Sequence, residues 1–385
     1  MPAPLPVWTA AGTAMMAEAF ERAARRPRVR DDLAAMTGYH SPQVSVEVRL
    51  NTNEAPTAPP EAFAKAVADA AVGLDWHRYP DRSATELRTV LGERFGFGPE
   101  QVFCANGSNE VLQTLLLTYA GPGRRTLTFE PTYALHRHLA RVTGSEPVMV
   151  ERSDDFRLDP TVATEAVAEH RPAITFLCSP NNPTGMVEPA ETVEAVLAAV
   201  EAVGGLLVVD EAYGEFSSWS AVDLVAENRS MVVTKTFSKT WAMAGARLGY
   251  SFGPSWLVAD LDTVVLPYHL DSLKQAAGVA ALALVDEMEA RVSHIVEERG
   301  RIAAELHRLG CEVWPSGANF VLFRPEPGAD AGSGRSVWQQ LVDRSILVRD
   351  TSSWERLDGC LRVTVGTSGE NSRFLAALAD ILDNR

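Results

Sequence analysis

The sequence predicts an α/β fold, in which a mainly parallel sheet is sandwiched by helices and followed by a smaller α+β domain. Three observations support this prediction. The chain has 385 residues, which exceeds the length at which single hydrophobic cores usually stop growing. Short apolar runs alternate with helical patterns, as in the βαβ units that build parallel sheets. A long helical pattern then leads into strands and helices that are interleaved in a different order.

The composition describes a soluble globular chain with a large core. The formal net charge is −15 and 46% of the residues are hydrophobic, and an acidic balance argues against binding to nucleic acid or anionic lipid. The 4 cysteines have no paired spacing, which indicates reduced thiols in a cytoplasmic protein. Because no His-Glu-x-x-His or similar pattern is present, we expect no metal site.

The N-terminal stretch is expected to form an arm. Residues 1 to about 30 are rich in Ala, Pro and Arg and contain no apolar run of signal-peptide length, so secretion is not expected. Met15 and Met16 leave open where translation begins, and the sequence does not decide whether the stretch is ordered. We expect an arm at 1–48, a large ligand-binding domain at 49–285 and a small C-terminal domain at 286–385.

Hydrophobic periodicity and turn residues place the elements of the large domain. The expected strands cover 44–50, 102–105, 126–129, 147–150, 173–178, 206–210 and 231–234. The expected helices cover 61–72, 111–119, 133–143, 160–170, 189–203 and 272–284. The segment Ser83-Ala84-Thr85-Glu86 has the pattern of a capping box and predicts the start of one more helix.

The C-terminal domain is expected to begin with a long amphipathic helix over 287–309, which we take as the spine between the two domains. Strand-like runs follow at 312–314, 319–323, 346–349 and 361–366, with helices around 337–343 and 371–382. Residues 325–334 are rich in Pro, Gly, Asp and Ser, so we expect a surface loop there.

Polar side chains follow three of the expected strands. Asn182, Asp210 and Lys239 each come at or shortly after the end of an apolar run. Open α/β sheets bind ligands at the carboxyl ends of their strands, so these side chains are candidates for one site. A carboxylate after four apolar residues is costly to bury, and Asp210 therefore requires a cationic partner, either an arginine or a protonated ring nitrogen.

The segment around Lys239 contains groups that suit a carbonyl and a phosphate. Lys239 can form a Schiff base, while Thr236, Ser238 and Arg247 can donate hydrogen bonds to an anion. The turn Gly107-Ser108-Asn109 can also bind phosphate at a helix N-terminus, although taken alone it is more typical of an ordinary N-cap. This combination suggests pyridoxal 5′-phosphate as the cofactor.

In chain order, several motifs resemble the fold-type I pyridoxal-phosphate aminotransferases: Asn182-Pro183-Thr184-Gly185, Asp210-x-x-Tyr213, Ser238-Lys239 and Arg247-x-Gly249-Tyr250. Other motifs are similar to the histidinol-phosphate aminotransferase branch, especially its actinobacterial members: Leu50-Asn51-Thr52-Asn53-Glu54, Arg78-Tyr79-Pro80-Asp81, Asn106-Gly107-Ser108-Asn109-Glu110, Tyr213-Gly214-Glu215-Phe216, Ser316-Gly317-Ala318-Asn319-Phe320 and Val348-Arg349-Asp350. The resemblance runs from about Asp31 to the C-terminus. It implies amino transfer between L-histidinol phosphate and 2-oxoglutarate by a ping-pong mechanism, as a step of histidine biosynthesis.

The resemblance also implies roles for single residues. Lys239 would bind the cofactor covalently and shuttle a proton, Asp210 would keep the pyridine nitrogen protonated, and Asn182 and Tyr213 would bond its phenolic oxygen. The other cofactor contacts would come from Ser108, Asn109, Tyr133, Thr236, Ser238 and Arg247, with Tyr79 reaching in from a second subunit. A homodimer with shared active sites is thus implied, and a monomer should be inactive.

The substrate side matches the branch less closely. By resemblance, Arg362 would clamp an α-carboxylate, Arg349 would favour a distal anion, and Asn53 and Thr57 would belong to the substrate pocket. The branch usually carries a tyrosine where this chain has Thr57. Either the pocket is rebuilt for another amino acid, or Thr57 and a neighbour compensate for the missing phenol.

Trp241 and Met243 are also bulkier than the resemblance leads us to expect. Two alternatives therefore stay open: a related aminotransferase for an aromatic or specialised biosynthetic amino acid, and a lyase, decarboxylase or cyclase that uses the same cofactor. A non-catalytic effector domain is not expected, because no helix-turn-helix module precedes residue 31.

Overall fold

The structure, a computed structural model, describes residues 27–34, 36, 38, 44–328 and 330–384. The chain divides into two units, residues 1–39 and residues 40–385. In the first unit, the described residues include a turn at 31–34. The expectations about residues 1–26 lie outside the described residues. The second unit contains all the helices and strands discussed below.

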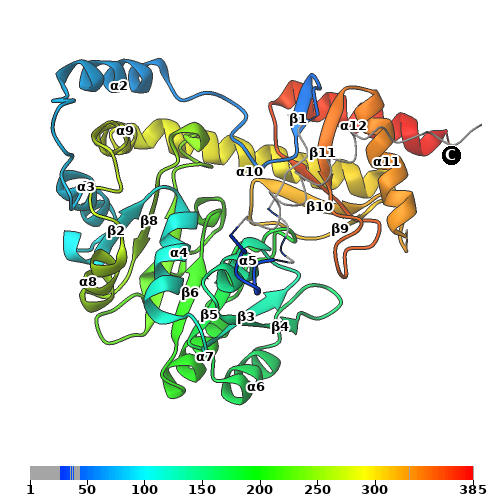
Figure 1. The fold of residues 1–385 in the computed structure, drawn as a ribbon. Coiled ribbons are helices and arrows are strands. Elements are labelled where there is room, and N and C mark those ends of the chain that lie inside the picture. Colours follow the sequence, from blue (N-terminus) through cyan, green and yellow to red (C-terminus); the bar gives the residue numbers. More distant parts are fainter. Residues whose placement is uncertain (1–26, 35, 37, 39–43, 329, 385) are drawn as a thin grey trace, which may run out of the picture. The chain divides into compact units, whose positions relative to one another are not determined.

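Within the described residues, seven strands form a sheet in the order β2-β8-β7-β6-β5-β3-β4 (Figure 1). They are β2 (Val102–Ala105), β3 (Arg125–Glu130), β4 (Glu146–Glu151), β5 (Ile174–Cys178), β6 (Leu206–Asp210), β7 (Met231–Thr236) and β8 (Gly249–Phe252). Neighbours from β7 to β4 are parallel, whereas β8 is antiparallel to both β2 and β7. The predicted mainly parallel sheet is confirmed; β8 has no counterpart in the sequence prediction.

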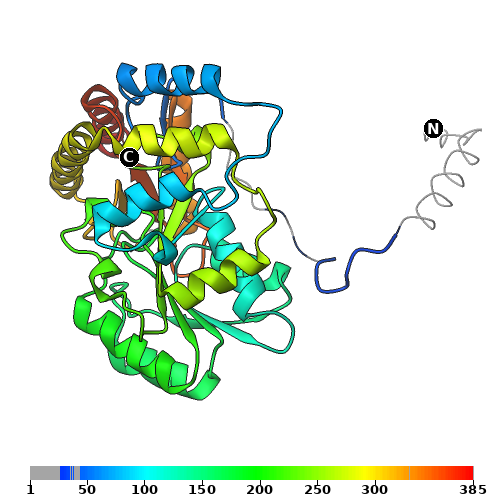
Figure 2. The ribbon, with the colours of Figure 1, turned by 90° about the vertical axis from the view of Figure 1, so that its left-hand side faces the viewer.

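Helices cover both faces of this sheet (Figure 2). Leu207 and Val209 of β6 pack on one face, while Leu206 and Val208 pack on the other, as the alternation of a strand requires. The first face is covered by α3 (Thr85–Phe95), α6 (Pro160–His170), α7 (Ala190–Ala202) and α9 (Ser272–Leu282), with α2 (Glu61–Gly73) against α9. The second is covered by α4 (Ser108–Tyr119), α5 (Leu135–Val142) and α8 (Ser255–Val264). Burial on both faces explains why the strands read as continuous apolar runs.

A second sheet of five described strands has the order β1-β11-β12-β10-β9. Its strands are β1 (Val48–Leu50), β9 (Glu312–Val313), β10 (Phe320–Arg324), β11 (Ile346–Asp350) and β12 (Leu361–Thr364). Its core is shared with α11 (Ala331–Asp343) and α12 (Ser368–Asp383). Strand β1 comes from the other end of the chain and pairs parallel with β11, so the segment that follows it starts at the C-terminal sheet.

Helix α10 (Val285–Arg308) joins the two cores (Figure 1). Met288 belongs to the core of the large sheet, whereas Ile295, Ile302 and Leu306 belong to the core of the second sheet. This is the arrangement that the long amphipathic pattern led us to expect; the domain boundaries at 48 and 285 stay a prediction.

Two local predictions were wrong. The capping box at Ser83 does not form: the N-cap of α3 is Ala84, with φ 47° and no side-chain cap. Instead, the Asp81 carboxylate accepts hydrogen bonds from the backbone N–H groups of Ser83 (3.0 Å) and Thr85 (2.7 Å).

The loop expected over 325–334 is the second error, since α11 already begins at Ala331. Asp330 starts this helix by accepting a hydrogen bond from the Ser333 N–H at 2.8 Å, and that cap outweighs the loop-like composition of the first turn. None of the described helices has the length and apolar content needed to cross a membrane.

Candidate functional site

A cavity of about 150 Å³ lies where the predicted polar side chains meet. Its lining consists of Ser108, Asn109, Tyr133, Cys178, Asn182, Asp210, Ala212, Tyr213, Thr236, Ser238, Lys239 and Arg247. Every cofactor-binding residue predicted from the sequence is in this set except Tyr79. The carboxyl ends of β5, β6 and β7 supply most of them, because parallel strands end at the same edge of a sheet.

Asp210 ends β6 and is only 2% exposed. Its Oδ2 lies 2.9 Å from Nε2 of His136, and its Oδ1 accepts a hydrogen bond from the Ala212 N–H at 3.1 Å. The His136 ring is held flat against Phe176, with centroids 4.7 Å apart. The partner of Asp210 within the described chain is thus a histidine, whereas the sequence had suggested an arginine or a ligand.

Lys239 follows β7, and its Nζ donates a hydrogen bond to the carbonyl of Thr52 at 3.1 Å. Burial lowers the pKa of Lys239 to about 8, with a further contribution from the positive charge of Arg362. A substantial fraction of this amine is therefore neutral near pH 8, and a neutral amine is the nucleophilic form.

Tyr213 is held by two amides. Its hydroxyl oxygen accepts hydrogen bonds from Nδ2 of Asn53 at 2.9 Å and from Nδ2 of Asn182 at 3.5 Å. Burial raises the pKa of Tyr213 to about 12, so the phenol keeps its proton. In both hydrogen bonds the asparagine is the donor, so the hydroxyl proton of Tyr213 is not used. It can be donated to a ligand in the cavity. Asn53, predicted to contact substrate, is itself 1% exposed and acts here through Tyr213 and Thr364.

Another part of the cavity lining carries hydrogen-bond donors suited to an anion. Arg247 donates to Oγ of Ser238 at 3.1 Å, and Thr236 donates to the same oxygen at 3.0 Å. Ser108 and Asn109 form the first turn of α4, where backbone N–H groups have no partner within the helix. Gly249 brings β8 close to this turn: a Cβ there would lie 2.2 Å from the backbone nitrogen of Ser108.

Two arginines lie opposite each other on neighbouring inner strands of the second sheet. Arg349 of β11 and Arg362 of β12 are register partners, and both are largely buried. Arg362 donates to the side-chain oxygen of Asn182 and to the carbonyl of Asn51. The guanidinium of Arg349 lies over the ring of Trp354 at 5.2 Å.

Other predicted positions lie away from the cavity lining. Tyr79 is 80% exposed and stacks on Tyr268, with ring centroids 4.5 Å apart. Thr57 is exposed and accepts a 3.5 Å hydrogen bond from Arg291. Trp241 and Met243 are buried in the core of the large sheet, so their bulk fills the core rather than the cavity.

The sequence prediction missed His136, Cys178 and Ala212. His136 carries no sequence signal for its role, because it follows no strand and belongs to none of the motifs quoted above. Cys178 and Ala212 could have been included, since each is a direct neighbour of a predicted strand-end segment.

The arrangement suits an elongated ligand with an anion at one end and a basic ring nitrogen at the other. The anion would meet Arg247, Ser238 and the N-terminus of α4, whereas the ring nitrogen would meet Asp210. Lys239 and Tyr213 would lie along the ligand, one as a nucleophilic amine and the other as a proton donor. The donor set and the close approach at Gly249 thus fit a phosphorylated pyridine aldehyde.

Comparisons with known proteins agree with this geometry. The family model of aminotransferase class I and II matches residues 45–378. The histidinol-phosphate aminotransferase of Frankia casuarinae is 46% identical over 366 residues, which cover 92% of this chain and 90% of that protein. The histidinol-phosphate aminotransferase of Mycolicibacterium smegmatis is 44% identical over 367 residues, with 92% and 93% covered.

Among solved structures, the histidinol-phosphate aminotransferase of Sinorhizobium meliloti in complex with pyridoxal-5′-phosphate is similar with a TM-score of 0.80. It is 26% identical in sequence, and the match covers 88% of this chain and 92% of that chain. The similarity therefore spans both sheets described above.

Proposed function

The chain belongs to the class I and II aminotransferases, with the fold-type I architecture, and from this membership we propose that it transfers the amino group of L-histidinol phosphate to 2-oxoglutarate. The two relatives named above, with more than 40% identity over nine tenths of the chain, are histidinol-phosphate aminotransferases, and this is the observation that carries the proposal. The reaction proceeds in two half-reactions of a ping-pong cycle and serves histidine biosynthesis. We place it in the cytoplasm.

We infer that pyridoxal phosphate is the cofactor. When bound, it supplies an aldehyde that combines with amines and a ring that accepts the electrons left by Cα–H cleavage. Arg247, Ser238, Thr236 and the N-terminal turn of α4 hold its phosphate group. Asp210, oriented by its contact with His136, would hold the proton of the ring nitrogen.

Three further residues complete the chemistry of the site. The Nζ of Lys239 holds the aldehyde before substrate arrives and afterwards moves a proton from the substrate Cα. The hydroxyl of Tyr213, fixed by Asn53 and Asn182, donates a hydrogen bond to the phenolic oxygen. Tyr133, which lines the cavity, covers the ring face.

The paired arginines of the second sheet account for the two anions that the site must accept in turn. Histidinol phosphate carries a phosphate near its amino carbon, and glutamate carries a carboxylate there. Arg362 and Arg349, which face each other on neighbouring strands, would bind these anions through their guanidinium groups. We assign Arg362 to the anionic group next to the amino carbon and Arg349 to an anion farther from that carbon. Thr57 contributes to the rim of the pocket.

We also propose a homodimer in which Tyr79 contacts the cofactor phosphate of the neighbouring subunit. Large side chains are exposed on two segments that meet where Tyr79 stacks on Tyr268: Trp76 (70%) and Tyr79 (80%) on one, Leu266 (75%) and Tyr268 (42%) on the other. Exposed aromatic clusters of this kind are typical of protein interfaces.

A half-reaction tests the proposed function. Holoenzyme is mixed with L-histidinol phosphate without any oxo acid, and loss of the cofactor's aldehyde absorbance is followed; 2-oxoglutarate should then restore it. Lys239→Ala should abolish both changes. Absence of any change with L-histidinol phosphate, together with a full change with phenylalanine or another amino acid, would overturn the substrate assignment but leave the aminotransferase chemistry standing.

A further inference from the structure

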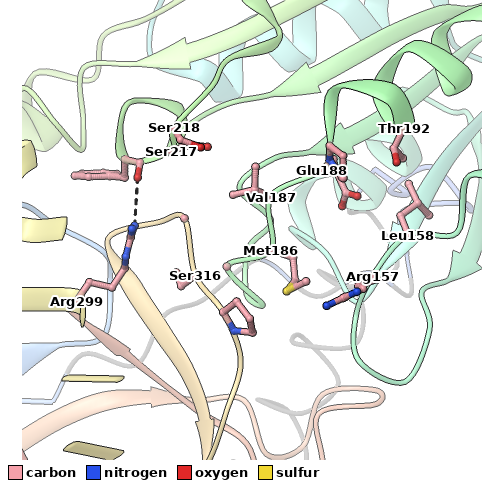
Figure 3. Close-up of a pocket in the computed structure, with 15 residues that line it drawn as sticks. Arg157, Leu158, Met186, Val187, Glu188, Thr192, Ser217, Ser218, Arg299 and Ser316 are labelled. Atoms are coloured by element: carbon pink, nitrogen blue, oxygen red, sulfur yellow. Dashed lines mark hydrogen bonds between the residues drawn. The ribbon is translucent and has the colours of Figure 1, made fainter. Parts of the chain in front are cut away.

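A second cavity, separate from the one that contains Lys239, lies between the segment after Asn182 and the loop before β10 (Figure 3). Its volume is about 500 Å³. Both parts of the chain contribute to it. Residues 185–189 and 216–218 come from the part with the large sheet. Arg299 comes from α10, and residues 315–317 come from the C-terminal part. The proposed amino transfer gives this cavity no role.

Much of the lining is apolar. Leu158, Met186, Val187, Pro189, Phe216 and Pro315 face the space. Such a surface favours a ligand with an aliphatic or aromatic body, because transfer of apolar area out of water drives its binding.

Arg299 provides a polar anchor in this apolar space. Its Nη1 donates hydrogen bonds to the backbone carbonyls of Phe216 (3.3 Å, dashed in Figure 3) and Ala318 (2.8 Å). Nε and Nη2 have no hydrogen-bond partner among the described residues. These two nitrogens form the edge of a guanidinium that binds a carboxylate or phosphate in bidentate fashion.

The charges around the cavity leave Arg299 without a counter-ion. Arg157 pairs with Asp155 at 3.1 Å, and Glu188 pairs with Arg152. No carboxylate of the described chain forms an ion pair with Arg299, and burial alone lowers its pKa. A desolvated cation that is fixed by two carbonyls is therefore available to an external anion.

A hydroxyl group lies next to this anchor. The Ser217 hydroxyl is buried and has no hydrogen-bond partner among the described residues, and Ser217 directly follows Phe216, whose carbonyl holds Arg299. A buried hydroxyl without a partner costs free energy.

We propose that this cavity is a second ligand site, which binds a small organic anion with a carboxylate or phosphate on Arg299 and an apolar body between Phe216 and Val187. The occupant would touch two segments that also line the cofactor cavity. Asn182 and the 185–189 stretch belong to one segment, and Tyr213 and the 216–218 stretch belong to the other. The Gly317 N–H bonds the carbonyl of Gly185 at 2.8 Å, which ties the first segment to the C-terminal part.

Binding of 4-fluorophenylacetate to the holoenzyme, followed by fluorine NMR, tests the proposal. Saturating L-histidinol phosphate, without an oxo acid, keeps the probe out of the catalytic cavity. Probe binding should persist under these conditions, and the neutral 4-fluorophenylacetamide should bind at least about tenfold more weakly, because it lacks the charge that Arg299 recognises.

Variants locate the site. Arg299→Met should weaken probe binding at least about tenfold, Arg299→Lys should restore part of it, and Arg308→Met, an exposed arginine of the same helix, should leave it unchanged. Ser218→Trp, at an exposed lining position, should block the cavity and abolish probe binding. This variant tests the site independently if the Arg299 variants fail to fold. The proposal is overturned if no probe binds beside saturating L-histidinol phosphate, if the amide binds equally well, or if Ser218→Trp has no effect.

Discussion

Lys239 is a buried amine whose pKa is set by its surroundings. Burial and the positive charge of Arg362 lower the pKa of Lys239 to about 8, while the carboxylate of Glu54 acts in the opposite direction. The neutral fraction of the amine therefore rises as the pH rises through about 8. The side chain of a free lysine is half neutral only near pH 10.4.

Cofactor capture should follow this titration. When pyridoxal phosphate is mixed with cofactor-free enzyme, the rate of covalent capture at Lys239 should rise with pH and level off above a midpoint near 8. Arg362→Met removes a positive charge and should move the midpoint upward. Stopped-flow absorbance across the pH range checks both expectations; a midpoint near that of free lysine would contradict them.

His136 acts on the site through Asp210. Its ring is fully buried against Phe176, and its Nε2 is the side-chain contact of the buried carboxylate. His136→Phe keeps the stacked ring but removes the hydrogen bond, so Asp210 would lose a contact that orients its carboxylate. We expect the turnover of L-histidinol phosphate to fall roughly ten- to a hundredfold.

A spectrum of the bound cofactor separates this effect from misfolding. In the variant, the pH dependence of the cofactor absorbance should change, whereas the melting temperature should stay close to that of the wild type. His138→Phe, on the same helix, is the matched control. Unchanged kinetics in His136→Phe would show that the hydrogen bond from His136 to Asp210 does not contribute to catalysis.

At the residue scale, the sequence was informative wherever a side chain follows a buried strand. Asn182, Asp210, Ser238 and Lys239 all line the cavity for this reason. Partners that are distant in sequence could not be predicted. The contact from Asp210 to His136 spans 74 residues, and the buried Lys235 pairs with Glu211 at 2.9 Å across neighbouring strands. Such pairs depend on strand order, which a local pattern does not contain.

At the element scale, β8 and α4 are packed backbone to backbone at the anion-binding end of the cavity. A Cβ on Gly249 would lie 2.2 Å from the nitrogen of Ser108 and 2.3 Å from the carbonyl carbon of Gly107. Gly249→Ala should therefore displace the first turn of α4 and weaken cofactor affinity by about tenfold or more, since overpacking costs on the order of 1–3 kcal/mol.

Titration of cofactor-free enzyme with pyridoxal phosphate measures this affinity. Gly245→Ala, in the turn that leads into β8 but with open space around its Cβ, should bind the cofactor as the wild type does. If Gly249→Ala also bound it normally, the close approach of β8 would not be needed for the phosphate site.

Most element types and boundaries could be predicted, because buried strands and amphipathic helices leave clear periodic patterns, but β8 and α8 had no counterpart in the prediction. The exceptions have local causes. Strand β8 is only four residues long and follows the Lys239 segment without a separate apolar run. Helix α3 begins at Thr85, whose N–H donates to the Asp81 carboxylate in place of a capping box, with Ala84 in the left-handed conformation between them.

At the scale of the whole molecule, the position of Tyr79 bears on the assembly. Within one chain, this side chain is 80% exposed, stacks on Tyr268 and does not line the cofactor cavity. If Tyr79 serves the cofactor phosphate, as proposed, it does so in a neighbouring subunit. The enzyme should then sediment as a dimer and lose activity on dilution below its dissociation constant.

Mixed dimers provide the sharper test. Lys239→Ala has no reactive amine but keeps Tyr79, whereas Tyr79→Ala keeps the amine but lacks the phenol. In a mixed dimer, one site regains Lys239 from one subunit and Tyr79 from the other. Random mixing should restore roughly a quarter of wild-type activity, because about half of the dimers are mixed and each has one complete site of two. Activity is measured at limiting pyridoxal phosphate, where loss of a phosphate contact is most visible. If Tyr79 acted within its own subunit, no mixed dimer would gain a complete site, and mixing would leave the activity at the average of the two variants.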